Sequence, residues 1–487
     1  MGAGKPRGVS GDKRRLAGLA LLRRTAAVLC ANSFDLADLY YKMSSERKEV
    51  PLSAREARER WKLFLRRRAA AYAGHFVNLY VSVPFCSTRC DFCEFYNKTG
   101  ASPEEVKDYL KATAEELRYF GGAFRGLKVR HLFIGGTPSY PDASGLSALL
   151  DGIFSSFSFA EDGQKVMECA PSTMSREKID IARAHGLNKI TMGVQTLDEK
   201  VSAAINRPQK TGAAIEFMDR IGSAGFAFGM NVDLIMGLHG ESAAGFLRSF
   251  SRTLGRGPET VTVYGLSPTA IYVKKFYGGD TAAIYRHLEK FRGKTEKRML
   301  ELAEAGGYVL LRRVQTREWL FCRKDKAAKY FEYYTYSSGF SQASFSTLGI
   351  GSGARSVLYG DFGYAQSLRV PRRFDSGSKM FSGGAIDLRD EMLKHLFVSF
   401  RSGAPVMIAQ FRQSFGLDPL AEFSDPLREL AALGYVEAGG GYIRLLRNTP
   451  EDCLFCGLVL VGLGRFLREI LPAFPEHIAG RLLPKAG

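Results

Sequence analysis

The chain has 487 residues, of which 45% are hydrophobic and 24% are charged. These values are ordinary for a folded protein, and they exclude wholesale disorder, a collagen and a small disulfide-stapled scaffold. Lys and Arg exceed Asp and Glu by 18, an excess that suits nucleic acid, anionic lipid or an acidic substrate. Residues 1–75 hold 17 basic and 7 acidic side chains without a nucleic-acid-binding motif, so we predict a solvated arm or helix face there, and no nucleic-acid partner.

The chain contains no apolar run of 18 residues, the length that a membrane-spanning helix needs. The strongest N-terminal candidate, residues 16–30, is interrupted by Arg23 and Arg24, which also argues against a signal peptide. Eight cysteines are too few for a disulfide scaffold, and three of them lie within eight positions. This spacing indicates metal ligation in a reducing compartment, so we predict a cytoplasmic protein.

Strands and helices alternate along the first two thirds of the chain. A helix is expected over residues 54–71, before the first strand. Strands are expected over residues 77–85, 129–134, 165–169, 189–194, 229–236 and 260–266. Helices are expected over residues 103–120 with Ser102 as N-cap, 144–157, 175–186, 211–224 and 242–254. Six strands alternating with five helices through short loops predict a parallel β/α sheet.

The rhythm changes after the sixth strand. A long helix is expected over residues 281–305, and residues 306–384 are mixed, with an aromatic stretch and a glycine-rich stretch. Residues 387–446 predict three helices followed by a hairpin around Gly439 to Gly441, which resembles a winged-helix unit, and residues 453–471 predict a final amphipathic helix. We therefore predict a basic helical extension (1–75), a β/α core (76–300), a mixed α/β segment that completes the substrate side (301–384) and a C-terminal winged-helix-like domain with a terminal helix (385–487).

Each predicted strand ends in a cysteine, a glycine or a polar residue. In a β/α barrel the carboxyl ends of the strands form the active-site face, so we expect these ends to meet there. The residues at these ends are Cys86, Gly135 to Thr137, Glu168, Gln195, Asp233 and Ser267.

Cys86, Cys90 and Cys93 form a C-x3-C-x2-C motif. Three thiolates from one loop can hold three irons of a 4Fe–4S cluster and leave the fourth iron open to a small molecule. The alternatives are a zinc site that lacks one ligand and three unrelated thiols. Structural zinc sites close with four ligands, and no neighbouring Cys or His completes this one, so the cluster is the favoured interpretation.

The motifs YVSVPFC-x3-C-x-F-C, FIGGTPS, LNKITMGVQTLD, INRPQ, VDLIMGL and GIGSGARS occur between Tyr80 and Ser356. The chain resembles the radical S-adenosylmethionine (SAM) superfamily, in the branch of oxygen-independent coproporphyrinogen III oxidase. That branch includes a related haem chaperone, anaerobic haem-degrading methyltransferases and similar radical C-methyltransferases. The resemblance implies an α/β fold, a partial (β/α)6 barrel between a helical N-terminal extension and a winged-helix-like α+β domain.

The resemblance also implies roles for individual residues. The three motif cysteines would ligate the cluster, and SAM would chelate the open iron through its amino and carboxylate groups. Gly135, Gly136 and Thr137 match the turn that approaches the methionyl part of SAM, and Tyr80 and Glu168 match further residues around that molecule. The branch founder binds a second SAM, so one or two molecules are implied here. The positions that match the second site are Phe92, Gln195, Arg207, Asp233 and Ser267.

The chemistry implied by the resemblance is one-electron cleavage of SAM to a 5'-deoxyadenosyl radical, which abstracts hydrogen from a substrate. The implied substrate is a tetrapyrrole or a similar planar metabolite that is oxidised, methylated or ring-opened, and the implied electron donor is a flavodoxin or ferredoxin. The alternative is a chaperone that delivers haem without turnover. A third hypothesis, RNA modification, is disfavoured because the basic extension lacks interleaved aromatic residues.

The chain departs from the branch pattern in four places: Glu94-Phe95 follows Cys93 in place of glycine and a fourth cysteine, Ser82 replaces a histidine, Lys189 replaces an arginine, and His239 replaces a proline. His239 could ligate haem iron or shuttle a proton, but a packed loop residue is the simpler interpretation. The pair Cys453 and Cys456 has no second pair nearby, which favours buried thiols over a metal site. Tyrosines in residues 330–336 could line an aromatic substrate pocket, but packing is the favoured interpretation. They are Tyr330, Tyr333, Tyr334 and Tyr336.

Overall fold

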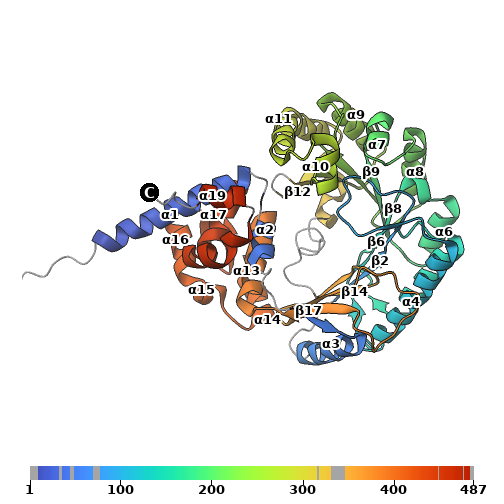
Figure 1. Ribbon diagram of the computed structural model, residues 1–487, viewed down its shortest axis with the longest axis horizontal. Coiled ribbons are helices and arrows are strands. Elements are labelled where there is room, and N and C mark those ends of the chain that lie inside the picture. The colour runs from blue at the N-terminus through green and yellow to red at the C-terminus, as the bar shows by residue number, and fades with distance from the viewer. Residues whose placement is uncertain are drawn as a thin grey trace, which may run out of the picture.

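The computed structural model describes residues 9–31, 34, 36–43, 49–69, 77–314, 317–330, 346–447, 449–474 and 476–482. The described elements form two lobes (Figure 1). The larger lobe holds a 13-stranded sheet with most of the helices packed around its outside, and the smaller lobe joins helices from both ends of the chain. The division into four domains stays a prediction.

Six neighbouring parallel strands form the centre of the sheet, as the alternation of strands and helices predicts. In sheet order they are β2 (Asn78–Val83), β6 (Leu132–Gly136), β8 (Lys165–Cys169), β9 (Lys189–Gln195), β10 (Met230–Met236) and β11 (Thr260–Gly265). The helices between them are α4 (Pro103–Gly121), α5 (Ala143–Ser156), α6 (Arg176–Ala184), α7 (Glu199–Ala204), α8 (Thr211–Ser223) and α9 (Ala243–Leu254). Ser102 caps α4 through a capping box with Glu105, so the predicted N-cap is confirmed.

The segment predicted as mixed supplies most of the strands that extend the sheet on both sides, and the N-terminal extension supplies one. On the β2 side the order continues with β14 (Thr347–Ile350), β15 (Arg355–Leu358), β16 (Phe362–Gln366), β17 (Phe381–Ala385) and β1 (Val50–Leu52). On the β11 side the hairpin of β13 (Glu318–Arg323) and β12 (Tyr308–Val314) follows. The sheet therefore begins at β1 and ends at β12, and it forms an open, partial barrel (Figure 1).

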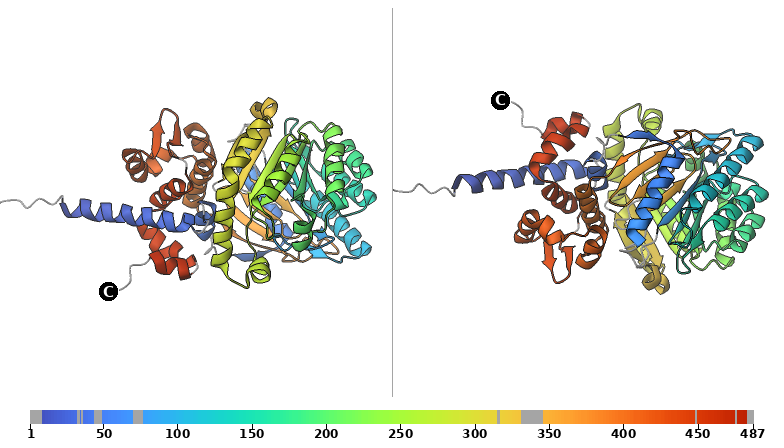
Figure 2. Two further views of the ribbon diagram at one scale, coloured as in Figure 1. Left: turned by 90° about the horizontal axis from the view of Figure 1, so that it is seen from above. Right: turned by 90° about the horizontal axis from the view of Figure 1, so that it is seen from below.

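Three helices close the larger lobe. Helix α3 (Ala54–Ala69) packs near the β17 edge, where the buried Trp61 donates a hydrogen bond to the Tyr364 hydroxyl at 2.8 Å. Helix α10 (Ala270–Tyr277) follows β11, and α11 (Thr281–Ala305) has the predicted bounds. In Figure 2, α11 runs along the boundary between the two lobes.

The smaller lobe joins the two ends of the chain in one hydrophobic core. The N-terminal helices α1 (Val9–Ala31) and α2 (Leu36–Met43) bury Leu29, Leu36 and Leu39 against α13 (Leu388–Ser402) and α17 (Pro450–Val461). A Cβ on Gly457 would lie 2.2 Å from Leu36, so glycine lets α2 approach α17 closely. The basic extension is thus more than a solvated arm, because its apolar side belongs to a core.

The remaining elements of this lobe fit the predicted winged-helix pattern of helices followed by a hairpin. They are β18 (Val406–Met407), α14 (Ile408–Phe415), α15 (Pro419–Glu422), α16 (Ser424–Ala432), β19 (Val436–Gly439) and β20 (Tyr442–Leu445). The three strands form a small antiparallel sheet in the order β18-β20-β19.

The prediction for the last helix is wrong in its bounds and its character. Helix α17 begins at Pro450, capped by Thr449, and ends at Val461, because Gly462 takes a φ of +88° that breaks the helix. Residues 452–461 of α17 are all buried, so the helix is enclosed and not amphipathic. Cys453 and Cys456 lie in this core, as predicted for buried thiols. The chain continues through α18 (Leu463–Arg465), a π-helical turn (Phe466–Ile470), a 3-10 turn (Leu471–Ala473) and α19 (Glu476–Leu482).

Within the described residues, every helix is too short or too polar to cross a bilayer. Of the tyrosines in residues 330–336, Tyr330 is buried against Phe228 and Cys322, which supports its packing role, and the other three lie outside the described residues.

Candidate functional site

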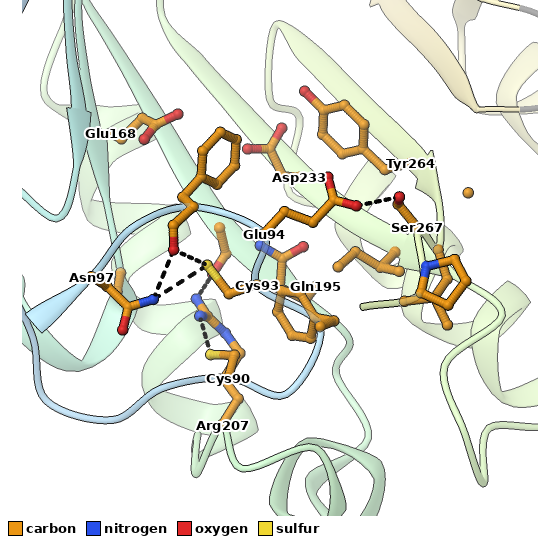
Figure 3. A pocket seen from close by; sticks show the side chains of 18 of the residues that line it. Cys90, Cys93, Glu94, Asn97, Glu168, Gln195, Arg207, Asp233, Tyr264 and Ser267 are labelled. Atoms are coloured by element: carbon orange, nitrogen blue, oxygen red, sulfur yellow. Dashed lines mark hydrogen bonds between the residues drawn. The ribbon is translucent and has the colours of Figure 1, made fainter. Parts of the chain in front are cut away.

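A cavity of about 600 Å³ lies at the carboxyl ends of the parallel strands (Figure 3). All six central strands or the loops that follow them contribute to its wall, as the pattern of strand ends predicts. Its volume is within the usual range for small-molecule sites. The strand-end residues in the wall are Cys86, Gly136, Thr137, Glu168, Gln195, Asp233 and Ser267.

The cysteine loop after β2 is fastened to the rest of the barrel at two positions. The Asn206 side chain donates to the carbonyl of Arg89 at 2.8 Å. Asp91 accepts from Lys275 at 2.7 Å through its carboxylate and from the Thr269 hydroxyl at 2.8 Å through its carbonyl. These contacts come from the loop after α7 and from α10, so distant segments fix the position of the cysteines.

Each of the three thiols is half-buried, lines the cavity and contacts at least one polar group. Cys86 lies 3.2 Å from the Thr137 hydroxyl, Cys90 accepts from Arg207 at 3.4 Å, and Cys93 accepts from Asn97 at 3.7 Å. Burial raises the pKa of the Cys86 and Cys93 thiols above their usual values. Iron ligands must be deprotonated, so the positive charge of the metal would have to offset this effect.

The donor set of the site fits a 4Fe–4S cluster. Three cysteines of one loop line one cavity wall, and each thiolate that holds such a cluster binds a separate iron. Among the described residues, no group of three or more Cys, His, Asp or Glu side chains is placed to hold a single metal ion.

The two glycines at the end of β6 are required for different reasons. A Cβ on Gly135 would lie 2.5 Å from the Tyr80 hydroxyl, so this glycine makes room for the tyrosine. Gly136 has a φ of +85°, and its Cβ would lie 2.3 Å from the Val83 carbonyl of the neighbouring strand. In this structure, glycine is required at position 136 because of the neighbouring strand β2 and the positive φ. The resemblance explains the same glycine differently, by the close approach of the methionyl part of SAM to the backbone.

Two carboxyl groups are enclosed in the cavity wall. Glu168 accepts from the backbone N–H of Gly136 at 2.9 Å, and burial together with the nearby Asp233 raises its pKa to about 8. Burial raises the pKa of Asp233 to about 7, although the Asn231 side chain donates to it at 2.7 Å. A cationic ligand in the cavity would favour the ionised form of both groups.

Gln195 and Arg207 present polar atoms that lack protein partners. Gln195 follows a β-bulge between β9 and β10 and has a φ of +69°, which is rare for a residue with a side chain. Its Oε1 and the Nε of Arg207 are both buried without a hydrogen-bond partner in the structure. Buried polar atoms of this kind usually have a partner, so these two atoms are suited to a bound ligand. The described contacts of Arg207 go to Cys90 and the Gly193 carbonyl, and none joins it to Asp233.

The structure brings most of the predicted site residues together. All three cysteines lie in the cavity wall, and so do Phe92, Gly136, Thr137, Glu168, Gln195, Arg207, Asp233 and Ser267. Tyr80 and Gly135 lie behind that wall, where they pack against each other. Their part in binding SAM stays a prediction.

Of the four departures from the branch pattern, only Glu94-Phe95 lines the cavity. The Ser267 hydroxyl donates to the Glu94 carboxylate across the cavity (Figure 3). Ser82 is buried within β2, and Lys189 is buried at the start of β9, the opposite end of that strand from the cavity. His239 stacks on Phe276 with ring centroids 4.6 Å apart, outside the cavity, which supports the packed-loop interpretation.

The cavity also has residues that the sequence analysis missed. Tyr264 lies at the end of β11, so the rule that strand ends face the site would have found it. Four further lining residues come from α1, α11, the position before β13, and α13: Cys30, Arg292, Arg317 and Arg401. No local signal marks these four, because they approach the cavity only through the packing of these distant segments.

Comparison with known proteins agrees with this geometry. Residues 80–251 match the model of the Radical SAM superfamily. The oxygen-independent coproporphyrinogen III oxidase of Escherichia coli is 26% identical over 385 residues, covering 76% of this chain and 81% of the relative. The enzyme of the same name from Salmonella typhimurium is 25% identical over 381 residues, covering 75% and 80% of the two chains. The heme chaperone HemW of Mycobacterium tuberculosis is 30% identical over 203 residues, covering 40% of this chain and 51% of the relative.

The fold is similar to that of the solved coproporphyrinogen III oxidase (HemN) from Escherichia coli. The TM-score is 0.65 at 22% sequence identity, and the match covers 81% of this chain and 91% of the solved chain. The chain thus carries a radical SAM domain with the fold of that protein. A 4Fe–4S cluster and SAM are the cofactors of this domain.

Proposed function

We propose that this radical SAM protein is an enzyme that acts on a tetrapyrrole or a similar planar metabolite by oxidation, methylation or ring opening. The observation that carries the proposal is the single cavity in which three cysteines meet the ends of all six central strands. Relatives named as coproporphyrinogen III oxidases match about three quarters of the chain, which supports the branch.

In this proposal, Cys86, Cys90 and Cys93 hold the cluster, and when bound the cluster and SAM supply the one-electron chemistry. The chain binds, orients and encloses the reacting groups. Arg207 places a positive charge beside Cys90, and Thr137 hydrogen-bonds with Cys86, so both stabilise thiolate ligands.

Glu94 supports a reaction other than decarboxylation of coproporphyrinogen. Its carboxylate lies inside the cavity, next to the cysteine loop, at a position where the oxidase has glycine. A carboxylate there repels a carboxylate of the substrate at the reacting end. We therefore propose that a less acidic edge of the substrate faces the cluster.

A haem chaperone is the second candidate, supported by the relatives named HemW. Incubation of the anaerobically reconstituted protein with SAM, a reductant and a panel containing haem and coproporphyrinogen III distinguishes the two candidates. An enzyme gives 5'-deoxyadenosine or S-adenosylhomocysteine together with a changed tetrapyrrole in the mass spectrum. Retention of haem with no change in either SAM or haem over many equivalents supports the chaperone and rejects the enzyme.

A second SAM molecule is part of the proposal. The Arg207 guanidinium is suited to a carboxylate, and its Nε and the Gln195 Oε1 are available to a ligand. Arg207→Ala is expected to lower the number of SAM molecules bound per cluster from two towards one, as measured by anaerobic equilibrium binding. A wild-type value of one would reject the second site. Loss of the cluster in the variant would instead show that Arg207 stabilises the Cys90 thiolate as a cluster ligand.

A further inference from the structure

Three of the five acidic residues that line the cavity lie at one end, and three of its four arginines lie at the other. Glu94, Glu168 and Asp233 belong to the cysteine loop and the strand ends. Three arginines lie at the other end, where the larger lobe meets the smaller one, which we call the seam. They are Arg292 on α11, Arg317 just before β13 and Arg401 on α13.

Two acidic residues, Glu289 and Glu318, line the same part of the cavity, so its wall at the seam carries three arginines and two carboxylates. Glu318 is bound by Arg312, and Asp38 of α2 is bound by Arg317 at 2.9 Å. Glu289 is exposed and lies one turn before Arg292 on α11. The ion pair that Arg292 forms is a long one, 4.0 Å to Glu296, and Glu296 is held more closely by Arg313 at 2.6 Å.

The seam also joins parts of the chain that only the tertiary structure brings together. Cys30, near the end of α1, lines the cavity together with residues of α11 and α13. Tyr285 on α11 lines the same cavity as Glu94 and Arg317. The cavity therefore runs from the cysteine loop to the seam.

We propose that Arg292, Arg317 and Arg401 bind carboxylate groups of the substrate. Guanidinium groups pair with carboxylates through two parallel hydrogen bonds, and such charge-assisted bonds strengthen in a partly enclosed site. A planar substrate with carboxylates on its rim is then oriented with those groups at the seam, and its opposite edge faces the cysteine loop. This subsite rests on the proposed function, because a tetrapyrrole with propionate side chains is a planar ligand that carries carboxylates on its rim.

The test uses the full-length, anaerobically reconstituted protein, with coproporphyrin III and its tetramethyl ester as fluorescent probes. The wild type is expected to bind the tetra-acid at least about tenfold more tightly than the ester, since each charge-assisted bond contributes roughly one order of magnitude. Arg292→Ala and Arg401→Ala are each expected to raise the Kd of the acid about tenfold and to leave the Kd of the ester unchanged. Arg317 is left in place because its contact with Asp38 joins the lobes.

Arg286→Ala is the matched control, because Arg286 lies on α11, is exposed and is not part of the cavity wall. It is expected to change neither Kd, and every variant should bind SAM as the wild type does. Equal binding of acid and ester by the wild type, or unchanged acid binding by both seam variants, would overturn the subsite while the tetrapyrrole assignment stands. Failure of both porphyrins to bind would overturn the tetrapyrrole assignment and this subsite with it.

Discussion

Replacement of Cys86, Cys90 and Cys93 by alanine is expected to abolish cluster binding and all SAM cleavage. The three thiols share one loop and one cavity wall, and no other cysteine among the described residues lies on that loop. Thiolates are the ligands of such clusters, so their removal leaves the irons without protein bonds. Iron and sulfide per chain after anaerobic reconstitution measure the loss.

The matched control is the double variant Cys453→Ala with Cys456→Ala. Both thiols are buried in the core of the smaller lobe, so this variant should keep its full iron content and lose stability by about 1 kcal/mol per site. The half-exposed loop cysteines should show the reverse pattern, with little effect on the unfolding of the metal-free protein. A full cluster in the triple variant, or its loss in the double variant, would contradict the assignment.

Gly136→Val is expected to reduce SAM cleavage by about 100-fold or more, the scale of effect that follows a shift of about 1 Å in an active site. The new Cβ would meet the Val83 carbonyl at 2.3 Å in a backbone conformation that favours glycine, so the end of β6 has to move. That movement displaces the Gly136 N–H, which donates a hydrogen bond to Glu168. It also displaces the Thr137 hydroxyl, which contacts Cys86. Formation of 5'-deoxyadenosine in single-turnover assays measures the effect.

Gly240→Val is the control that distinguishes the effect of the contact with Val83 from the effect of a positive φ. Gly240 has a φ of +80°, close to that of Gly136, but its Cβ would have no neighbour within 4 Å. The Gly240 variant should retain SAM cleavage within a few-fold of the wild type and lose about 1–3 kcal/mol of stability at most. Equal loss of cleavage in both variants would show that strain alone, and not the contact with β2, explains the effect at Gly136.

The sequence predicts the central sheet well because each of its signals is local. Strands buried on both faces appear as short apolar runs, and a capping residue such as Ser102 marks a helix start without reference to the rest of the fold. The convergence of the strand ends then follows from the parallel topology. Glu168, Gln195 and Asp233 could therefore be placed on one face from the amino-acid sequence alone.

The parts that could not be predicted depend on contacts between distant segments. Residues 306–384 carry weak strand signals, and their strands are defined by pairing with the edges at β2 and β11. The seam arginines lie on elements that are far apart in the sequence, and no sequence pattern indicates that these elements pack around one cavity. Gly136 illustrates a third limit, since the motif identifies the residue and only the structure shows that Val83 constrains it.

The shared core of the smaller lobe has a consequence for biosynthesis. Helices α1 and α2 are synthesised before the barrel, yet their apolar faces are covered by α13 and α17, which are synthesised more than 340 residues later. Such long sequence separation delays the closing of this lobe until α17 has been synthesised. Until then the cavity lacks the wall that Cys30 and Arg401 provide, so the nascent barrel offers iron and sulfide a wider entrance to the cysteine loop than the finished protein does.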